Sequence, residues 1–217
     1  MLNFYANPLS PHVAKIHYLM EEAGIHYKYH MVDLRSAAAK AELAKVSPFG
    51  KVPAIELNGF CLGESNAVAR YLVERYHLSA LYPLNLEERA QVDMVYEFVQ
   101  AHVNRWLQSL TWNLSVAPKF GQVPDSKAVS DALAQLPTGL ARLESWLSGR
   151  TYLAGPDFTL ADVALLPTLA DYRSAQITLA DYPRLHAWLD RVSARPAWKK
   201  YQADYVARVD EYLKLAR

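Results

Sequence analysis

Ser10 is the first residue of the chain whose type and position could do chemistry. It follows a short strand predicted at Leu2–Ala6 and a turn, and together with Pro11 it has the pattern of a helix start. A hydroxyl there either caps the helix or donates a hydrogen bond to a bound anion, which the helix dipole also attracts. A thiol bound beside it would be shifted toward its thiolate. The glycine-flanked elbow of a serine hydrolase is absent, so a hydrolase triad is not expected.

Two further stretches place polar groups at the start of an element. Val52-Pro53 opens a predicted strand, where the Val52 backbone could pair with a peptide ligand as a short added strand. The residues alone favour a trans bond, since only about one X–Pro bond in twenty is cis. Glu64-Ser65 opens a helix and is either an ordinary cap or an amino-acid clamp. In the clamp, Glu64 takes an ammonium group, while Ser65 and the helix amides take a carboxylate.

The composition narrows the kind of chemistry. The 217 residues include 23 Lys and Arg against 22 Asp and Glu, a net charge of +1, so the basic signature of a nucleic-acid-binding protein is missing. The single cysteine, Cys61, excludes an intramolecular disulfide and a multi-cysteine metal site, and the seven histidines show no paired ligand spacing. We therefore expect neither a nucleic-acid partner nor a metal.

The chain also lacks the signals of membrane insertion and export. No apolar stretch reaches 18 residues, so we expect no membrane partner. The first residues lack the charged and apolar regions of a signal peptide. These observations predict a cytoplasmic protein.

Residues 1–79 alternate between strand and helix patterns. A crossover helix makes the first two strands parallel, whereas Asn58-Gly59 predicts an antiparallel hairpin. The order β-α-β-α-β-β-α therefore predicts an α/β domain with a mixed four-stranded sheet. The strands are expected at Leu2–Ala6, Tyr27–Val32, Ala54–Leu57 and Phe60–Leu62, and the helices from Pro11 to about Gly24, over Ala37–Val46, and from Ser65 to about Tyr76.

Strand patterns end after a linker at residues 80–86. We expect residues 87–217 to form an all-α domain, because apolar residues recur there at helical spacing. Thr159-Leu160-Ala161-Asp162 resembles a capping box ahead of one of these helices. The other helices are predicted around Val92–Leu110, over Val129–Leu147 with a kink or break at Pro137, and over Pro183–Val192.

Together, the motifs resemble those of the glutathione S-transferase family. Each piece is common by itself, but five in this order over nearly the whole chain are specific. The pattern is most similar to the classes with a serine at this position, including the plant-like phi and tau classes and the theta class. The pieces are Ser10-Pro11 with Lys15-Ile16, Ser47-Pro48-Phe49-Gly50-Lys51-Val52-Pro53, Glu64-Ser65-Asn66-Ala67-Val68, Phe158-Thr159-Leu160-Ala161-Asp162-Val163, and Tyr182-Pro183-Arg184-Leu185 with Trp188.

The resemblance implies a fold and an activity. It implies a thioredoxin-like domain at residues 1–79 that binds glutathione, and a helical domain at 87–217 that contributes the site of an apolar electrophile. The expected enzyme is a cytosolic homodimer that uses glutathione as its co-substrate in detoxification and needs no metal. Glutathione-dependent peroxide reduction or isomerisation on the same site remains an alternative, as does a non-catalytic ligand-binding protein.

The resemblance also assigns roles by position. Ser10 would be the hydroxyl that stabilises the glutathione thiolate. The backbone of Val52, followed by a cis Pro53, would pair with the cysteinyl unit of glutathione. Glu64 and Ser65 would hold its γ-glutamyl end.

Other positions complete the expected site. Lys51 and Lys40 are expected to contact glutathione, Lys40 at the glycyl carboxylate, and Phe49 is a candidate for a dimer interface. A helix stripe that includes Gln100 and Asn104 could face the electrophile. The candidate contacts of the electrophile are Leu9, Leu107 and Thr111.

Tyr5 and Cys61 are the alternatives to Ser10 for the reacting group. Tyr5 could assist or replace Ser10, although a strand aromatic more often packs in a core. Cys61 lies in a predicted strand, and we expect it to be a buried small hydrophobe. The reactive thiol would then arrive with the ligand.

Overall fold

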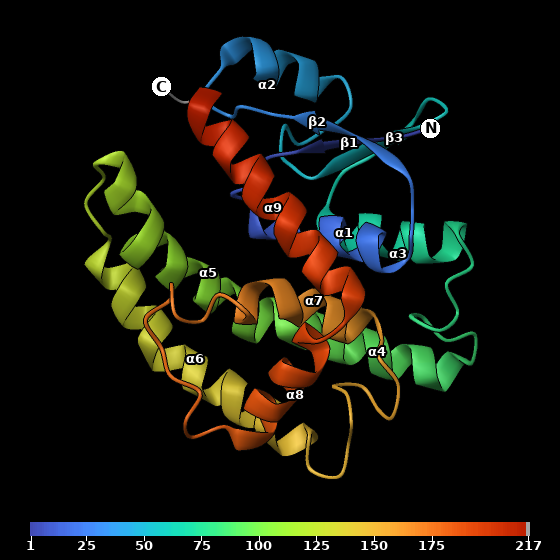
Figure 1. Ribbon diagram of the computed structural model, residues 1–217, viewed down its shortest axis with the longest axis vertical. Helices are drawn as coiled ribbons and strands as arrows, with labels where there is room; N and C mark the ends of the chain where they lie inside the picture. The colour runs from blue at the N-terminus through green and yellow to red at the C-terminus, as the bar shows by residue number, and fades with distance from the viewer. Residues whose placement is uncertain (216–217) are drawn as a thin grey trace. The chain divides into compact units, whose positions relative to one another are not determined.

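The computed structural model describes residues 1–215, and its chain divides into two compact units (Figure 1). The first, which we call the sheet unit, contains residues 1–78 together with the chain from Arg195 onward. The second, the helical unit, is Ser79–Ala194. The two units are described separately below.

The sheet unit is built on four strands in the order β2-β1-β3-β4. β1 and β2 are parallel, whereas β3 is antiparallel to both β1 and β4. The expected mixed sheet is therefore confirmed. The strands are β1 (Leu2–Ala6), β2 (Tyr27–Met31), β3 (Ala54–Leu57) and β4 (Phe60–Leu62).

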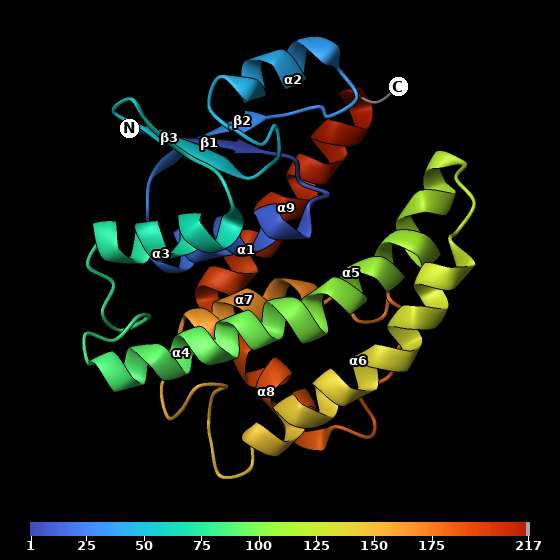
Figure 2. The same ribbon diagram turned by 180° about the vertical axis from the view of Figure 1, so that it is seen from behind.

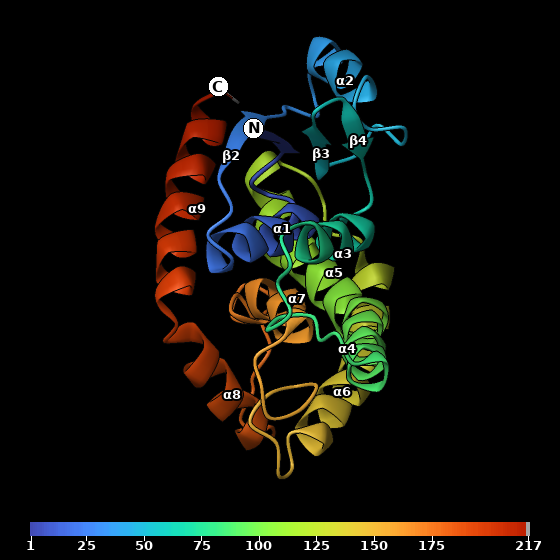
Figure 3. The ribbon, with the colours of Figure 1, turned by 90° about the vertical axis from the view of Figure 1, so that its right-hand side faces the viewer.

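Helices cover the two faces of this sheet. α1 (Pro11–Glu22) and α3 (Ser65–Arg75) lie side by side on one face, and α2 (Ala37–Ala44) lies on the other (Figure 3). β1 alternates accordingly: Phe4 is fully buried and contacts α1 through His17, while Tyr5 packs toward the α2 side. The alternating burial along β1 thus shows which face of the sheet each of its side chains points to.

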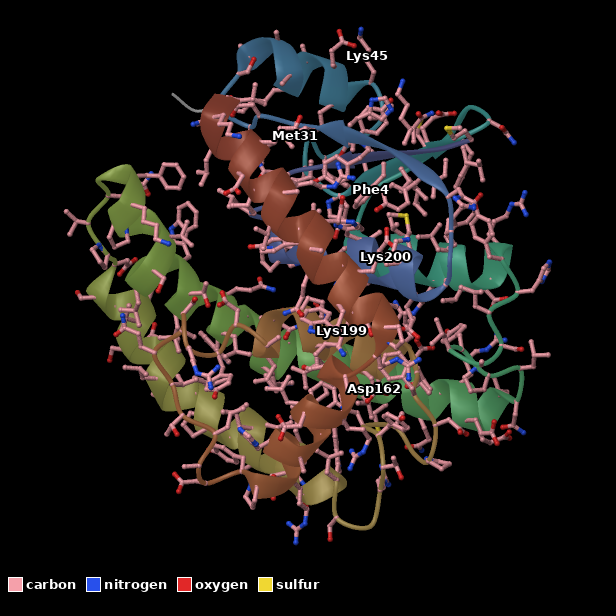
Figure 4. The ribbon with its side chains drawn as sticks, in the orientation of Figure 1. Phe4, Met31, Lys45, Asp162, Lys199 and Lys200 are labelled. Carbon is pink, nitrogen blue, oxygen red and sulfur yellow. The ribbon has the colours of Figure 1, made fainter. Side chains whose placement is uncertain are left out.

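The last helix, α9 (Pro196–Leu215), packs on α1 within the sheet unit (Figure 3). Lys200, labelled in Figure 4, places its Nζ 2.6 Å from a carboxylate oxygen of Glu21, and Asp204 lies 2.9 Å from Nε2 of His17. The sequence pattern instead predicts this segment as part of the helical domain, residues 87–217. The difference arises because the polar groups of α1 find their partners on α9, a long-range pairing that helical periodicity does not reveal.

In the helical unit, α4, α5 and two π-helical segments follow one another as a long rod beside α6 (Figure 2). A Cβ added at Gly139 of α6 would lie 2.5 Å from the His102 carbonyl oxygen, so the two backbones approach closely there. α6 runs through Pro137 as one continuous helix. The elements are α4 (Leu86–Phe98), η1 (Val99–Asn104), α5 (Arg105–Thr111), η2 (Trp112–Val116), a 3₁₀ turn η3 (Ala117–Phe120), α6 (Ser126–Trp146), α7 (Leu160–Leu169) and α8 (Pro183–Ser193).

Asp162, labelled in Figure 4, organises the start of α7 and is fully buried. It forms the expected capping box with Thr159, and its carboxylate also accepts hydrogen bonds from the Leu153 N–H and from Nε1 of Trp188, at 3.0 and 2.7 Å. Burial raises the pKa of Asp162 to about 6, although these donors act in the opposite direction. One side chain thus joins α7, α8 and the loop before them.

We expect Asp162→Ala to lower the free energy of unfolding by at least ~3 kcal/mol, because it leaves several buried donors without an acceptor. Urea unfolding of the purified protein measures this change. Asp157→Ala is the matched control, since Asp157 is exposed in the preceding loop and its loss should change stability by about 0.5 kcal/mol or less. Equal stability losses in the two variants would contradict the role given to Asp162.

Candidate functional site

Ser10 is the N-cap of α1, and its side chain makes no capping hydrogen bond. Its backbone oxygen accepts from the N–H groups of Val13 and Ala14, so the helix begins at this residue. Within residues 1–215 the structure gives the Ser10 hydroxyl no hydrogen-bond partner, and the residue is half-buried. The hydroxyl is therefore available to a ligand at the positive end of the helix dipole.

Asn7 holds the turn that carries Ser10. Its side-chain amide donates to the carbonyl of Val32 at 3.0 Å, and its Oδ1 accepts from the N–H of Leu9 at 3.0 Å. The Asn7 carbonyl also accepts from the Ser10 N–H. Asn7 is buried, and the sequence analysis did not single it out. A polar residue at the end of a core-facing strand was the signal that could have found it.

The Val52–Pro53 peptide bond is cis, as the family resemblance implied. Ser47, which is 1% exposed, holds the preceding loop: its hydroxyl donates to the Lys51 carbonyl at 2.8 Å and accepts from the Lys51 N–H at 3.2 Å. In the described part of the chain the Val52 backbone has no hydrogen-bond partner, because the β1–β3 ladder begins at Ala54. The Val52 backbone is therefore free to pair with an extended ligand.

Glu64 precedes α3 with a φ of 62°, a left-handed conformation that residues other than glycine rarely adopt. It makes no side-chain capping bond, and Ser65 after it is buried. The Glu64 side chain therefore does not cap the first amides of α3, which is where anions bind at helix starts. Such backbone conformations persist where the surrounding structure holds them, and they are common at ligand clamps.

His12, in the first turn of α1, shows that the three stretches come together. Partial burial lowers its pKa, the charge of Lys15 lowers it further, Glu64 opposes this, and Lys51 lowers it again. These groups belong to α1, to α3 and to the loop before β3, so all three lie within electrostatic reach of one ring. The sequence pattern did not assign a role to His12, although this residue lies only two positions after Ser10.

The other site residues predicted from the sequence differ in how far they are buried. Lys40 is exposed on α2, Phe49 is 59% exposed in its loop, and Leu9 is half-buried beside Ser10. In the helical unit Leu107 is fully buried, whereas Thr111 is half-buried. Their functional roles remain predictions.

Asn104 belongs to the stripe that was expected to face the electrophile. It is buried, and its amide donates to the Ala164 carbonyl of α7 at 2.9 Å. Asn104 therefore faces the interior of the helical unit, because the π-helical segment η1 packs against α7.

Tyr5 packs against the cluster formed by Val32, Leu43 and Ala54, and its ring stacks on His30 with centroids 4.7 Å apart. Burial raises the pKa of its hydroxyl, and nearby acidic groups raise it further. These contacts assign Tyr5 a packing role in the sheet unit and favour Ser10 as the reacting hydroxyl.

The expectation that Cys61 is buried is wrong, because the structure exposes it. Cys61 lies opposite Glu56 on β4, a three-residue strand at the edge of the sheet. A strand pattern predicts alternation between two faces but not which face remains uncovered.

Two other features are absent from residues 1–215. No three His, Cys, Asp or Glu side chains are grouped so that they could hold a metal ion. Likewise, none of the helices described combines the length and the apolar character needed to cross a membrane.

Known proteins show the same two-part organisation. Residues 1–74 match the family model "Glutathione S-transferase, N-terminal domain", and residues 107–196 match "Glutathione S-transferase, C-terminal domain". "Glutathione S-transferase 3" of Zea mays is 33% identical over 205 residues, which is 92% of this chain and 92% of the relative. The chain belongs to the glutathione S-transferase family.

Other relatives agree with this assignment. "Glutathione S-transferase F10" of Arabidopsis thaliana is 32% identical over 212 residues, 94% of this chain and 98% of the relative. The solved structure of glutathione S-transferase I from mais, in complex with an atrazine glutathione conjugate, superposes with a TM-score of 0.83 at 28% identity and covers 93% of this chain and 96% of its own. The expected fold, a thioredoxin-like domain followed by a helical domain, is confirmed. The expected type of enzyme, a glutathione transferase, is also confirmed.

We expect Asn7→Ala to reduce the free energy of unfolding by ~1–3 kcal/mol, because the Leu9 N–H and the Val32 carbonyl both lose a buried partner. Thermal and urea unfolding measure the loss. Asn7→Asp is the matched variant, since it keeps the acceptor for Leu9 and loses only the donor to Val32. An unchanged midpoint in Asn7→Ala would show that Asn7 does not hold the turn.

Proposed function

We propose that the protein transfers glutathione to small apolar electrophiles, with the Ser10 hydroxyl donating a hydrogen bond to the glutathione thiolate. One observation carries this proposal: the caps of α1 and α3, Ser10 and Glu64, leave their first-turn amides without a side-chain acceptor. A bound anionic peptide would supply acceptors at these two helix starts.

The energy required for the thiolate is modest. A free thiol has a pKa near ~8.5, and lowering it by about two units takes about 2.7 kcal/mol of differential stabilisation. A hydrogen bond from Ser10 to the charged sulfur contributes ~1.5–3 kcal/mol, and the dipole of α1 adds ~0.3–1 kcal/mol. The two contributions suffice without a metal or a covalent enzyme intermediate. The remaining acceleration comes from holding thiolate and electrophile together.

We assign the rest of glutathione to the neighbouring groups. Glu64 receives the ammonium of the γ-glutamyl end, and Ser65 with the first amides of α3 receives its carboxylate. The free backbone of Val52 pairs with the cysteinyl unit, which would set the sulfur near Ser10. Two exposed cations, Lys51 and Lys40, are the remaining contacts, with Lys40 at the glycyl carboxylate.

For the electrophile, a small aromatic compound fits the family. The structure from mais contains an atrazine glutathione conjugate. Leu9, which directly precedes Ser10 and is half-buried, is the candidate apolar contact in the sheet unit. In the helical unit the candidates remain Leu107 and Thr111.

We further propose that the protein acts as a cytoplasmic homodimer without a metal. Phe49 is the candidate contact of this dimer, because it is 59% exposed and aromatic residues are enriched at protein interfaces. Its loop is also the one that presents Val52.

Ser10→Ala should lower kcat/KM for conjugation of glutathione to a chloronitrobenzene by about 10- to 100-fold, the value of one hydrogen bond to a charged group. The loss should shrink at high pH, where the thiol ionises without help. Ser10→Thr keeps a hydroxyl and should retain most of the rate. If Ser10→Ala keeps the full rate from pH 6 to pH 8, the proposed role of Ser10 is refuted.

Product analysis distinguishes conjugation from the alternative of peroxide reduction, because conjugation yields a thioether and peroxide reduction yields glutathione disulfide.

Glu64→Gln should weaken glutathione binding by about tenfold, because it removes the charge opposite the ligand's ammonium and keeps the side chain's size. Calorimetric titration with glutathione measures the affinity. Glu88→Gln, an exposed first-turn acid of α4, is the control that should bind like the wild type. Equal affinity of all three proteins would reject the clamp. Failure of the wild type to bind millimolar glutathione would reject the proposed function itself.

A further inference from the structure

Lys15 is a buried cation that the proposed thiolate chemistry does not use. Its residue is 3% exposed, and its Nζ donates to Oδ1 of Asn66 at 2.6 Å. Lysine is almost never buried to this extent unless it is paired, because removing its charge from water is costly. An apolar pair would join two helices at lower cost. The contact therefore needs an explanation beyond simple packing.

The bond connects the two helix starts that carry the site. Lys15 lies one turn along α1 from His12, on the same face, and Asn66 is the second residue of α3, directly after Ser65. α1 and α3 pack against each other in the sheet unit. The Lys15–Asn66 hydrogen bond thus links the turn that begins at Ser10 to the turn that begins at Glu64.

The start of α3 needs such a link. Glu64 has a positive φ and makes no side-chain cap, so the usual local device that fixes a helix start is missing here. A contact from another element must then hold the strained residue in place. The Lys15–Asn66 bond reaches the chain two residues after Glu64.

The charge of Lys15 also reaches the surface of the site. It is the neighbouring charge with the largest effect on His12, whose pKa it lowers, ahead of the effects of Glu64 and Lys51. A bound carboxylate at the start of α3 would experience the same positive charge in a partly desolvated setting.

We infer that Lys15 is a positioning residue: through Asn66 it fixes the first turn of α3 so that Glu64 and Ser65 hold the γ-glutamyl end of the ligand. This inference rests on the proposed glutathione function and deepens it. Lys15 acts on ligand affinity, whereas Ser10 acts on the chemical step. The two residues should therefore affect different kinetic constants.

The test compares four variants. Lys15→Met removes the charge and the donor while keeping an unbranched chain, Lys15→Arg restores both, and Asn66→Ala removes the acceptor alone. Lys28→Met, on an exposed position of β2, is the control. Lys15→Met should raise both KM and Kd for glutathione about tenfold and leave kcat at saturating glutathione close to that of the wild type. Asn66→Ala should raise Kd in the same direction, and Lys15→Arg should restore it.

A double-mutant cycle and amide exchange complete the test. The Lys15→Met and Asn66→Ala effects on Kd should be far from additive, because both remove the same bond. In the ligand-free protein, exchange of the amides at residues 68–70 should accelerate in Lys15→Met, while exchange in α9 stays unchanged. If Lys15→Met fails to fold, Asn66→Ala alone carries both measurements.

The outcomes separate the inference from the proposed function. Unchanged exchange at the start of α3, or equal losses of stability and affinity in Lys15→Met and Lys15→Arg, would overturn the positioning role. If the wild type does not bind glutathione, the proposed function fails. Amide exchange in the ligand-free variants then still decides whether Lys15 holds α3.

Discussion

The two helix starts that lack a side-chain cap, those of α1 and α3, are the constraint on which the site depends. Every helix leaves its first N–H groups without an intrahelical acceptor, and most helices of this chain satisfy one or more of them locally. The cap side chains of α2, α4 and α6 accept from first-turn amides. In α7 the Asp162 carboxylate accepts from the N–H of the cap residue Thr159, and Glu144 accepts from two amides of α8. α1 and α3 lack this device. These two uncapped helix starts carry Ser10 and Glu64, the residues that the proposed function assigns to the ligand.

Keeping two helix starts open requires support from elsewhere in the sheet unit. Asn7 ties the turn before α1 to the end of β2, and Ser47 closes the loop before Pro53 on itself. Lys15 and Asn66 join the two helices. α9 contacts α1 through His17 and Glu21, and Arg195, just before α9, pairs with Glu22. None of Asn7, Ser47, Lys15 and Asn66 is itself assigned a contact with the ligand. These contacts hold the starts of α1 and α3, where side-chain caps are missing.

Much of this organisation is readable from the sequence, because it follows from local periodicity. The strands were predicted to within one residue, and the capping box of Asp162 follows from its spacing to Thr159. The residues that carry the family resemblance include those that the structure places at the two open helix starts. Short-range patterns are informative here because a cap, a hairpin and an alternating strand each depend on neighbours in sequence.

The features that could not be predicted from the sequence depend on contacts between residues far apart in the chain. Asn7 matters because of the Val32 carbonyl, and α9 joins the sheet unit because Arg195 meets Glu22 across more than 170 positions. Cys61 was misassigned because burial in an edge strand depends on what covers the strand, not on its own residues. Each miss has one physical origin: the deciding partner belongs to another element.

The near-zero net charge means that the charges near the proposed site matter more than the overall charge of the chain. With 23 basic and 22 acidic residues, the chain as a whole has almost no long-range attraction for an anionic peptide. The field that matters is set within a few ångströms by the two helix starts, by Lys15 and Lys51, and by Glu64. His12 responds to these side-chain charges, since both lysines lower its pKa and Glu64 raises it. On the proposed function, recognition therefore depends on the turns that carry Ser10, Val52 and Glu64, and charges elsewhere on the surface should have little effect on it.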